Sequence, residues 1–148
     1  MPTNQLANNM TETIMPNIEQ SVNDEVKPNI IVSVTTAYIP EHSNELEKRY
    51  VFSYTITITN NSEESIKLLT RYWLITDANE DTSTVAGEGV IGKQPVIAPN
   101  KSFQYTSGCV LKTPVGTMQG HYQVINENNK NIQVEIPVFR LALPNILN

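Results

Sequence analysis

Hydrophobic and polar residues alternate with a period of two from Ile30 to Tyr38, and again from Tyr50 to Ile58. Such alternation is typical of strands that bury one face and expose the other. Asn60-Asn61-Ser62 indicates a turn, because asparagine tolerates left-handed backbone angles. The alternation then resumes, with Ile66, Leu68, Tyr72 and Leu74 on one face and Leu69, Trp73 and Ile75 on the other. A strand that is apolar on both faces is expected near the centre of a sheet.

The second half of the chain also consists of short extended segments separated by turns. Turns are predicted at Asp77–Asp81, at Pro99-Asn100 and at 126–131. Strands are predicted at 82–86, from Phe103 onward, at 118–124 and at 132–136, with a last separate strand at 139–143. No amphipathic helix lies between them. Seven or eight short strands in this arrangement predict an all-β, antiparallel sandwich or barrel.

The chain before Ile30 has a different composition. Residues Met1 to Asn29 are mainly asparagine, threonine, glutamate and proline, with isolated apolar positions. Such a segment does not bury enough apolar surface to offset the entropy of ordering it. We therefore expect a mobile tail at 1–29, followed by one folded domain at 30–148.

Composition narrows the classes of function. Fifteen acidic and ten basic residues give a net charge of -5, which provides no general attraction to nucleic acid or to an anionic membrane surface. The single cysteine, Cys109, excludes an internal disulfide framework and a multi-cysteine zinc site. The chain shows no export signal and no apolar run long enough to span a membrane. These features predict a soluble, cytoplasmic protein.

Gly87, Gly89 and Gly92 have the G-x-G-x-x-G spacing of dinucleotide-binding folds. That motif requires a helix directly after the glycines, whose free amides hold the pyrophosphate. Pro95 and Pro99 oppose such a helix, and no Asp or Glu occurs between Gly89 and Asn126 to hold a ribose. We interpret the glycines as residues that allow bends and close backbone approach.

An anion site without a helix is the alternative for this loop. The acid-free stretch contains Lys93, Lys101 and Lys112, and a nest of glycine amides with Lys93 could bind a pyrophosphate or another small anion. The simpler explanation of these three lysines is that each one faces solvent, as lysines usually do.

Other reactive side chains are sparse. Asp77, Glu80 and Asp81 could attract a hard cation weakly, although a solvated turn explains them better. Cys109 and His121 could meet as nucleophile and base, but no helix N-terminus or elbow turn marks an activated residue. We expect Cys109 in the core, His121 at the surface, and Arg71 in a structural role beside an aromatic ring or a carboxylate. No catalytic residue, metal site or cofactor is predicted.

Four longer segments together resemble the ApaG family. They are RYWLITD at 71–77, GEGVIGKQPVIAP at 87–99, YTSGCVLKTPVGTMQGHY at 105–122 and IPVFRLALPNIL at 136–147. The resemblance extends from about Ile30 to the C-terminus and implies an immunoglobulin-like or fibronectin type III-like sandwich. It also implies a genetic association with cobalt and magnesium tolerance, and interaction modules in eukaryotic relatives. Many members of the family have glycine where this chain has Asn100. Asparagine at this position preserves only the geometry of the turn.

These observations favour a non-enzymatic interaction domain. We expect a sheet face or an edge strand to bind a protein partner or a second copy of the chain. Binding of pyrophosphate-containing nucleotides or other small anions is the first alternative, and weak sensing of divalent cations is the second.

Overall fold

The computed structural model describes residues 29–146. The predicted mobile tail therefore lies outside the described residues, except for Asn29. The first strand begins at Ile30, where the alternating pattern begins in the sequence.

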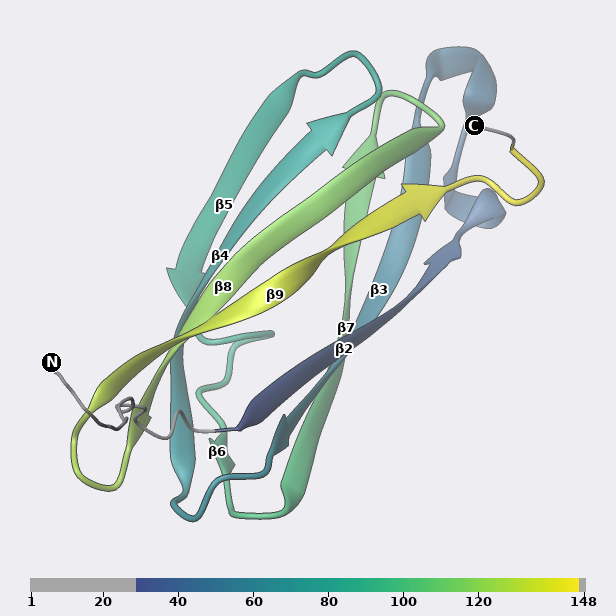
Figure 1. The fold of residues 1–148 in the computed structure, drawn as a ribbon. Coiled ribbons are helices and arrows are strands. Elements are labelled where there is room, and N and C mark those ends of the chain that lie inside the picture. Colours follow the sequence, from purple (N-terminus) through teal and green to yellow (C-terminus); the bar gives the residue numbers. More distant parts are fainter. Residues whose placement is uncertain (1–28, 147–148) are drawn as a thin grey trace, which may run out of the picture.

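Two antiparallel sheets form a sandwich (Figure 1). The first sheet has the order β2 (Ile30–Tyr38), β3 (Tyr50–Asn60) and β7 (Lys101–Leu111). The second has the order β5 (Thr82–Glu88), β4 (Ile66–Asp77), β8 (Val115–Asn126) and β9 (Asn131–Ala142), and β6 (Val96–Ile97) pairs with the start of β4. The connection between β2 and β3 contains two single-turn 3-10 helices, η1 (Pro40–His42) and η2 (Glu45–Glu47). The predicted all-β sandwich of seven or eight strands is confirmed.

The core lies between the sheets and follows the sequence alternation. In β3 the side chains of Phe52, Tyr54, Ile56 and Ile58 are buried, while the threonines and serines between them face outward. Trp73 of β4 packs at the centre, with its ring centroid 5.3 Å from that of Tyr54 and 5.7 Å from that of Phe139. As predicted, β4 is central, because it pairs with β5, β6 and β8.

The predicted faces of β4 are wrong beyond Leu68, because the strand contains a bulge. Its pairing with β8 shifts between Leu68 and Thr70. One extra residue in a strand moves all later side chains to the opposite face. Leu68 and Trp73 therefore both point into the core, whereas Tyr72 lies on the outer face.

The predicted separate strand at 139–143 is also wrong, because these residues continue β9 as far as Ala142. Pro137 lies within β9, where the pairing with β8 shifts between Met118 and Gly120. A proline, which lacks the N–H needed for a regular ladder, is tolerated here because β9 is an edge strand and the bulge interrupts its pairing. The predicted hairpin turn at 126–131 is confirmed.

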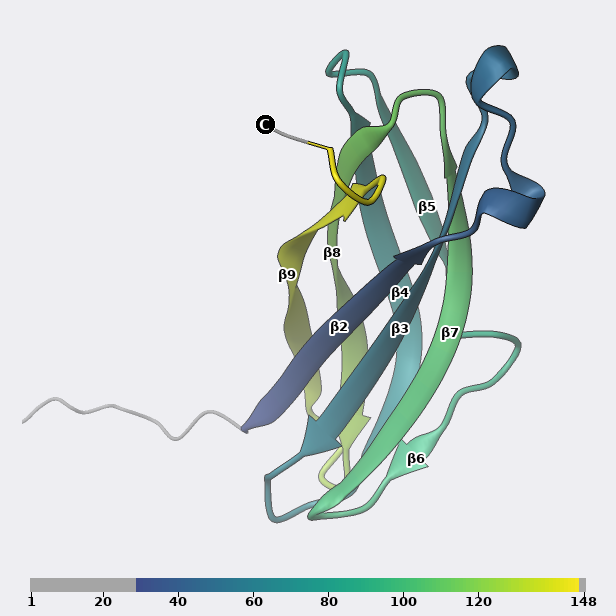
Figure 2. The same cartoon turned by 90° about the vertical axis from the view of Figure 1, so that its right-hand side faces the viewer.

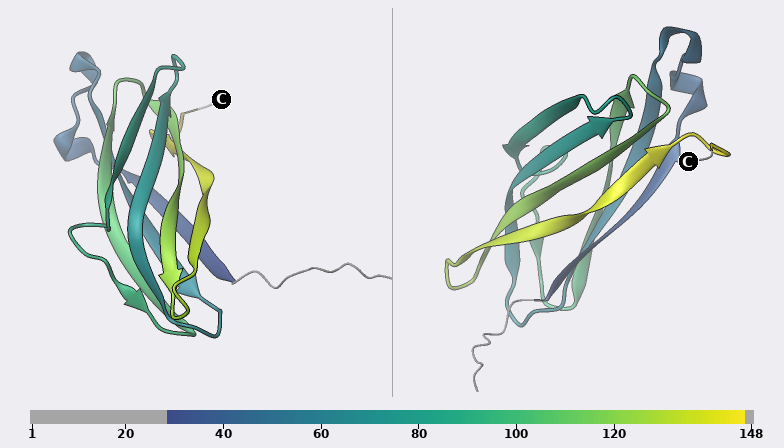
Figure 3. Two further views of the ribbon diagram at one scale, coloured as in Figure 1. Left: turned by 90° about the vertical axis from the view of Figure 1, so that its left-hand side faces the viewer. Right: turned by 45° about the horizontal axis from the view of Figure 1, so that its top comes forward.

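The two sides of the sandwich differ. β2 and β9 approach each other closely and nearly close one side. On the other side β7 ends the first sheet and β5 ends the second, with no more than marginal contact between these two strands (Figure 2). Figure 3 shows the same asymmetry from two other directions.

Candidate functional site

The glycine loop connects β5 to β6 and projects from the sandwich (Figure 2). No helix follows Gly92, since the described chain continues through an isolated bridge into β6. The structure therefore agrees with the exclusion of a dinucleotide-binding turn.

Each glycine of the loop has its own structural reason. A Cβ atom on Gly87 would lie 2.8 Å from Nη1 of Arg71. A Cβ atom on Gly89 would lie 2.1 Å from the carbonyl oxygen of Lys93, and Gly89 has a φ of +63°. Gly92 has a φ of +78° and open space around it, so only its backbone angle requires glycine. The spacing is thus explained without a ligand.

Three backbone amides of the loop, those of Gly89, Val90 and Lys93, are hydrogen-bonded within the protein. Val90 and Lys93 exchange both backbone hydrogen bonds across a tight turn, at 2.8 and 2.9 Å. The N–H of Gly89 donates to the carbonyl of Leu69 at 2.8 Å. The side chain of Val90 is fully buried and anchors the turn to the core. The amides of Gly89, Val90 and Lys93 are therefore already bonded to carbonyls and do not contribute to an anion nest.

The three lysines of the acid-free stretch do not converge. Lys101 begins β7, and Lys112 follows its last residue, so the two lie roughly 35 Å apart along the strand. Lys93 lies in the separate glycine loop. Arg71 is the cation beside the loop, and its Nη1 donates to the carbonyls of Glu88 and Gly89 at 3.2 and 3.0 Å. The predicted aromatic or carboxylate partner of Arg71 is thus replaced by backbone carbonyls.

The carboxylate of Asp77 organises the turn between β4 and β5. Its Oδ1 accepts hydrogen bonds from the amides of Asn79 and Asp81, at 2.8 and 3.0 Å. Within residues 29–146, no group of three or more His, Cys, Asp and Glu side chains is placed to hold a metal ion. The structure therefore does not bring Asp77, Glu80 and Asp81 together as a cation site.

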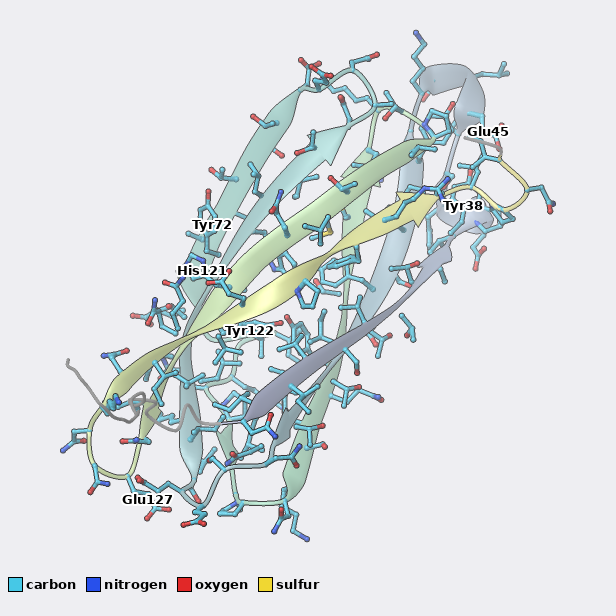
Figure 4. All side chains as sticks on the ribbon, viewed as in Figure 1. Tyr38, Glu45, Tyr72, His121, Tyr122 and Glu127 are labelled. Carbon is cyan, nitrogen blue, oxygen red and sulfur yellow. The ribbon has the colours of Figure 1, made fainter. Side chains whose placement is uncertain are left out.

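His121 and Cys109 lie on different sheets and do not meet. His121 is on the outer face of β8, where its ring stacks on Tyr72 with centroids 5.1 Å apart (Figure 4). The expected surface position of His121 is confirmed. Cys109 is in the core, as expected, and burial raises the pKa of its thiol to about 11. A thiol with this pKa is protonated at neutral pH and is a poor nucleophile.

A pair of tyrosines joins the two sheets through the core. The hydroxyl groups of Tyr105 in β7 and Tyr122 in β8 are 2.5 Å apart and buried. Burial raises the pKa of Tyr105 to about 12, and burial followed by the Tyr105 hydroxyl raises the pKa of Tyr122 further. Both hydroxyls stay protonated at neutral pH, so they serve as a structural link between the sheets.

The outer face of the first sheet carries no charge, a feature that the sequence analysis did not identify. We call it the hydroxyl face. Strand register places its residues in rows across the sheet: Ile31, Thr59 and Ser102; Ser33, Thr57 and Gln104; Thr35, Thr55 and Thr106; Ala37, Ser53 and Gly108; Val51 and Val110. The sequence feature that could have predicted this face is the absence of charged residues at every outward position of the three strands.

Hydrogen bonds cross the hydroxyl face between neighbouring strands. The hydroxyl oxygens of Thr55 and Thr106 are 2.8 Å apart, as are those of Thr59 and Ser102. Nε2 of Gln104 donates to Oγ1 of Thr57 at 2.9 Å. Side chains that bond to one another are ordered before any partner arrives and have fewer hydrogen bonds to water.

Comparison with known proteins identifies the family. The sequence model of the ApaG domain matches residues 40–126. The chain belongs to the ApaG family. It is 50% identical to Protein ApaG of Proteus mirabilis over 119 residues, which are 80% of this chain and 95% of that protein. It is 49% identical to Protein ApaG of Escherichia coli over 121 residues, which are 82% of this chain and 97% of that protein.

A solved structure shares this fold at high sequence identity. The crystal structure of the putative ApaA protein from Bordetella pertussis has a TM-score of 0.79 and 46% sequence identity. The match covers 82% of this chain and all of that chain. The family model and the identity to proteins named ApaG confirm the ApaG resemblance stated from the sequence. Among the described residues of this ApaG protein, no helix is long and apolar enough to cross a membrane.

Proposed function

We propose that this ApaG protein is a non-enzymatic interaction domain that binds a protein partner through the hydroxyl face. The observation that carries the proposal is the complete absence of charge on this face. On soluble domains, roughly a quarter to a third of surface residues are charged, so a face of this size is expected to carry about four charged side chains. Interface centres are depleted in charge in the same way.

The chemistry of the face suits a protein surface better than a small polar ligand. Its centre consists of short threonine and serine side chains, with Ile31 and Val110 about half exposed near opposite ends. Because several of these hydroxyls already bond to one another, covering them removes fewer hydrogen bonds to water than covering isolated hydroxyls would.

The size of the face argues for reversible binding. With strand and residue spacings of a regular sheet, its area is roughly 450 Å². A stable complex covers about 800 Å² on each partner. We therefore propose a transient complex, or one that also uses neighbouring surfaces. We propose that any link to cobalt and magnesium tolerance acts through such a partner.

The test is a charge placed at the centre of the face. Thr57→Lys is expected to abolish binding of proteins captured from native lysate. Gln123→Lys on the outer face of β8 adds the same charge elsewhere and is expected to leave capture unchanged. Sedimentation of both variants and the parent protein shows whether the partner is a second copy. If Thr57→Lys retains every partner of the parent protein, the hydroxyl face is not the binding surface.

A further inference from the structure

β5 is attached to the rest of the protein almost only through β4. It is the terminal strand of its sheet, and within the described residues it makes at most marginal contacts with any other element. The residues Thr82 to Ala86 are exposed on both faces of the strand, and the side chain of Val85 is 42% exposed. The first sheet ends at β7, which makes no more than marginal contact with β5.

The free edge of β5 lacks the features that usually prevent strand addition. Edge strands are commonly protected by charges, prolines or bulges. The segment from Thr82 to Gly87 contains no charge and no proline, and it pairs with β4 without a register shift. At the other end of the same sheet, β9 has Glu135, Pro137 and a bulge.

The backbone of β5 presents hydrogen-bonding groups to this free edge. The amide of Gly89 donates to Leu69, so the alternation of a strand directs the amides of Val85 and Gly87 toward β4. The amides of Thr84 and Ala86 point the other way, to the edge that no described strand occupies. An added strand can therefore pair with β5 without disturbing its ladder to β4.

A cleft beside β5 can take side chains of an added strand. Its volume is about 180 Å³, and it lies between the end of β4 and start of β5 on one side and the end of β7 on the other. It is lined by Ile75, Asp77, Asp81, Thr82, Ser83, Val110, Leu111 and Lys112. The lining thus combines apolar surface with two carboxylates and one ammonium group.

The charges at the ends of β5 decide which strand fits. Asp81 precedes the strand and Glu88 ends it, with Asp77 and Glu80 in the adjoining turn. If two copies paired antiparallel through β5, Glu88 of one would lie near Asp81 of the other at both ends. Like charges at such distances oppose pairing. A peptide with basic residues at its ends and uncharged residues between them is complementary to the same edge.

We propose that the free edge of β5 binds an extended peptide as an added strand, with an uncharged β-branched centre and a lysine or arginine beyond each end. The free edge of β5 belongs to the other sheet from the hydroxyl face, and the two surfaces share only Val110, which also lines the cleft. The proposal stands whether or not that face binds a partner.

The test uses a fluorescent peptide of alternating threonine and valine flanked by lysines, with a glutamate-flanked peptide of the same centre as the matched control. Fluorescence anisotropy is expected to show binding of the lysine-flanked peptide only. Thr84→Pro removes an amide from the free edge and should abolish binding, whereas Thr57→Lys on the hydroxyl face should not change it. The double variant Asp81→Lys/Glu88→Lys should weaken the lysine-flanked peptide by roughly tenfold and strengthen the glutamate-flanked one.

Hydrogen exchange supplies a readout that does not depend on any variant. The lysine-flanked peptide should slow exchange at the amides of Thr84 and Ala86 in the unmodified protein. The proposal is overturned if the peptide does not bind at millimolar concentration, if these amides gain no protection, or if charge reversal leaves the preference between peptides unchanged. Dimerisation through β5 in the absence of peptide would also overturn it. If Thr57→Lys loses partner capture but still binds the lysine-flanked peptide, the result supports the hydroxyl face as a second binding surface and does not contradict the site on β5.

Discussion

At the residue scale, the two glycines with left-handed angles predict different sensitivities. Gly89→Ala places a Cβ atom 2.1 Å from the carbonyl oxygen of Lys93, whereas Gly92→Ala meets no atom within 4 Å. Both substitutions carry the cost of a positive φ, about 1–2 kcal/mol. We expect Gly92→Ala to lower the free energy of unfolding by about that amount and Gly89→Ala to lower it further, as measured by urea denaturation. If both variants lose the same free energy of unfolding, the close contact between the new Cβ atom and the Lys93 carbonyl oxygen does not destabilise the protein.

Cys109 predicts a dependence of stability on alkaline pH. Burial raises the pKa of its thiol to about 11, above the ordinary value near 9. The unfolded chain therefore loses this proton first as pH rises. The stabilisation is fully present below about pH 9 and is lost as pH rises toward 11. The urea midpoint should fall between pH 8 and pH 10.5, and less steeply in Cys109→Ala. Identical slopes in the two proteins would contradict a buried, protonated thiol.

At the scale of elements, Asn60 ties the β3–β4 turn to β6. Its side chain is fully buried, and Nδ2 donates to the carbonyls of Glu64 and Ile97, both at 2.9 Å. Its Oδ1 accepts from the amide and the hydroxyl of Ser62. Asn60→Ala leaves buried groups unpaired, so we expect a loss of about 2–3 kcal/mol in chemical denaturation. The exposed neighbour Asn61 is the control, and a similar loss in Asn61→Ala would assign the effect to the turn sequence instead.

The sequence predicts elements better than it predicts how they meet. Strand positions and most turns follow from local alternation and turn residues, and Asn100 indeed adopts a φ of +65°. The bulge after Leu68 leaves no local signal, because it depends on pairing with β8, which is far along the chain. The sequence predicts separate strands at 132–136 and 139–143, and the edge position of β9 explains why one strand continues through Pro137. The hydroxyl face also appears only when the register of three strands is known.

At the scale of the whole molecule, the sandwich has one nearly closed side and one open side. On the closed side β2 approaches β9, whereas β5 and β7 leave their edges uncovered. The glycine loop and the cleft beside β5 both lie toward the open side. The free edge of β5 and the cleft beside it therefore follow from a three-stranded sheet that faces a larger one. Neither of them follows from a single motif.

The connection between the sheets can be measured through the tyrosine pair. Tyr105→Phe or Tyr122→Phe leaves one buried hydroxyl without its partner, so each should lower the free energy of unfolding by about 1–3 kcal/mol. The double variant removes both polar groups and should lose less than the sum of the single losses. A double-mutant cycle in urea gives this coupling energy. Strict additivity would mean that the two hydroxyls do not interact, and the sheets would then be held together by apolar packing alone.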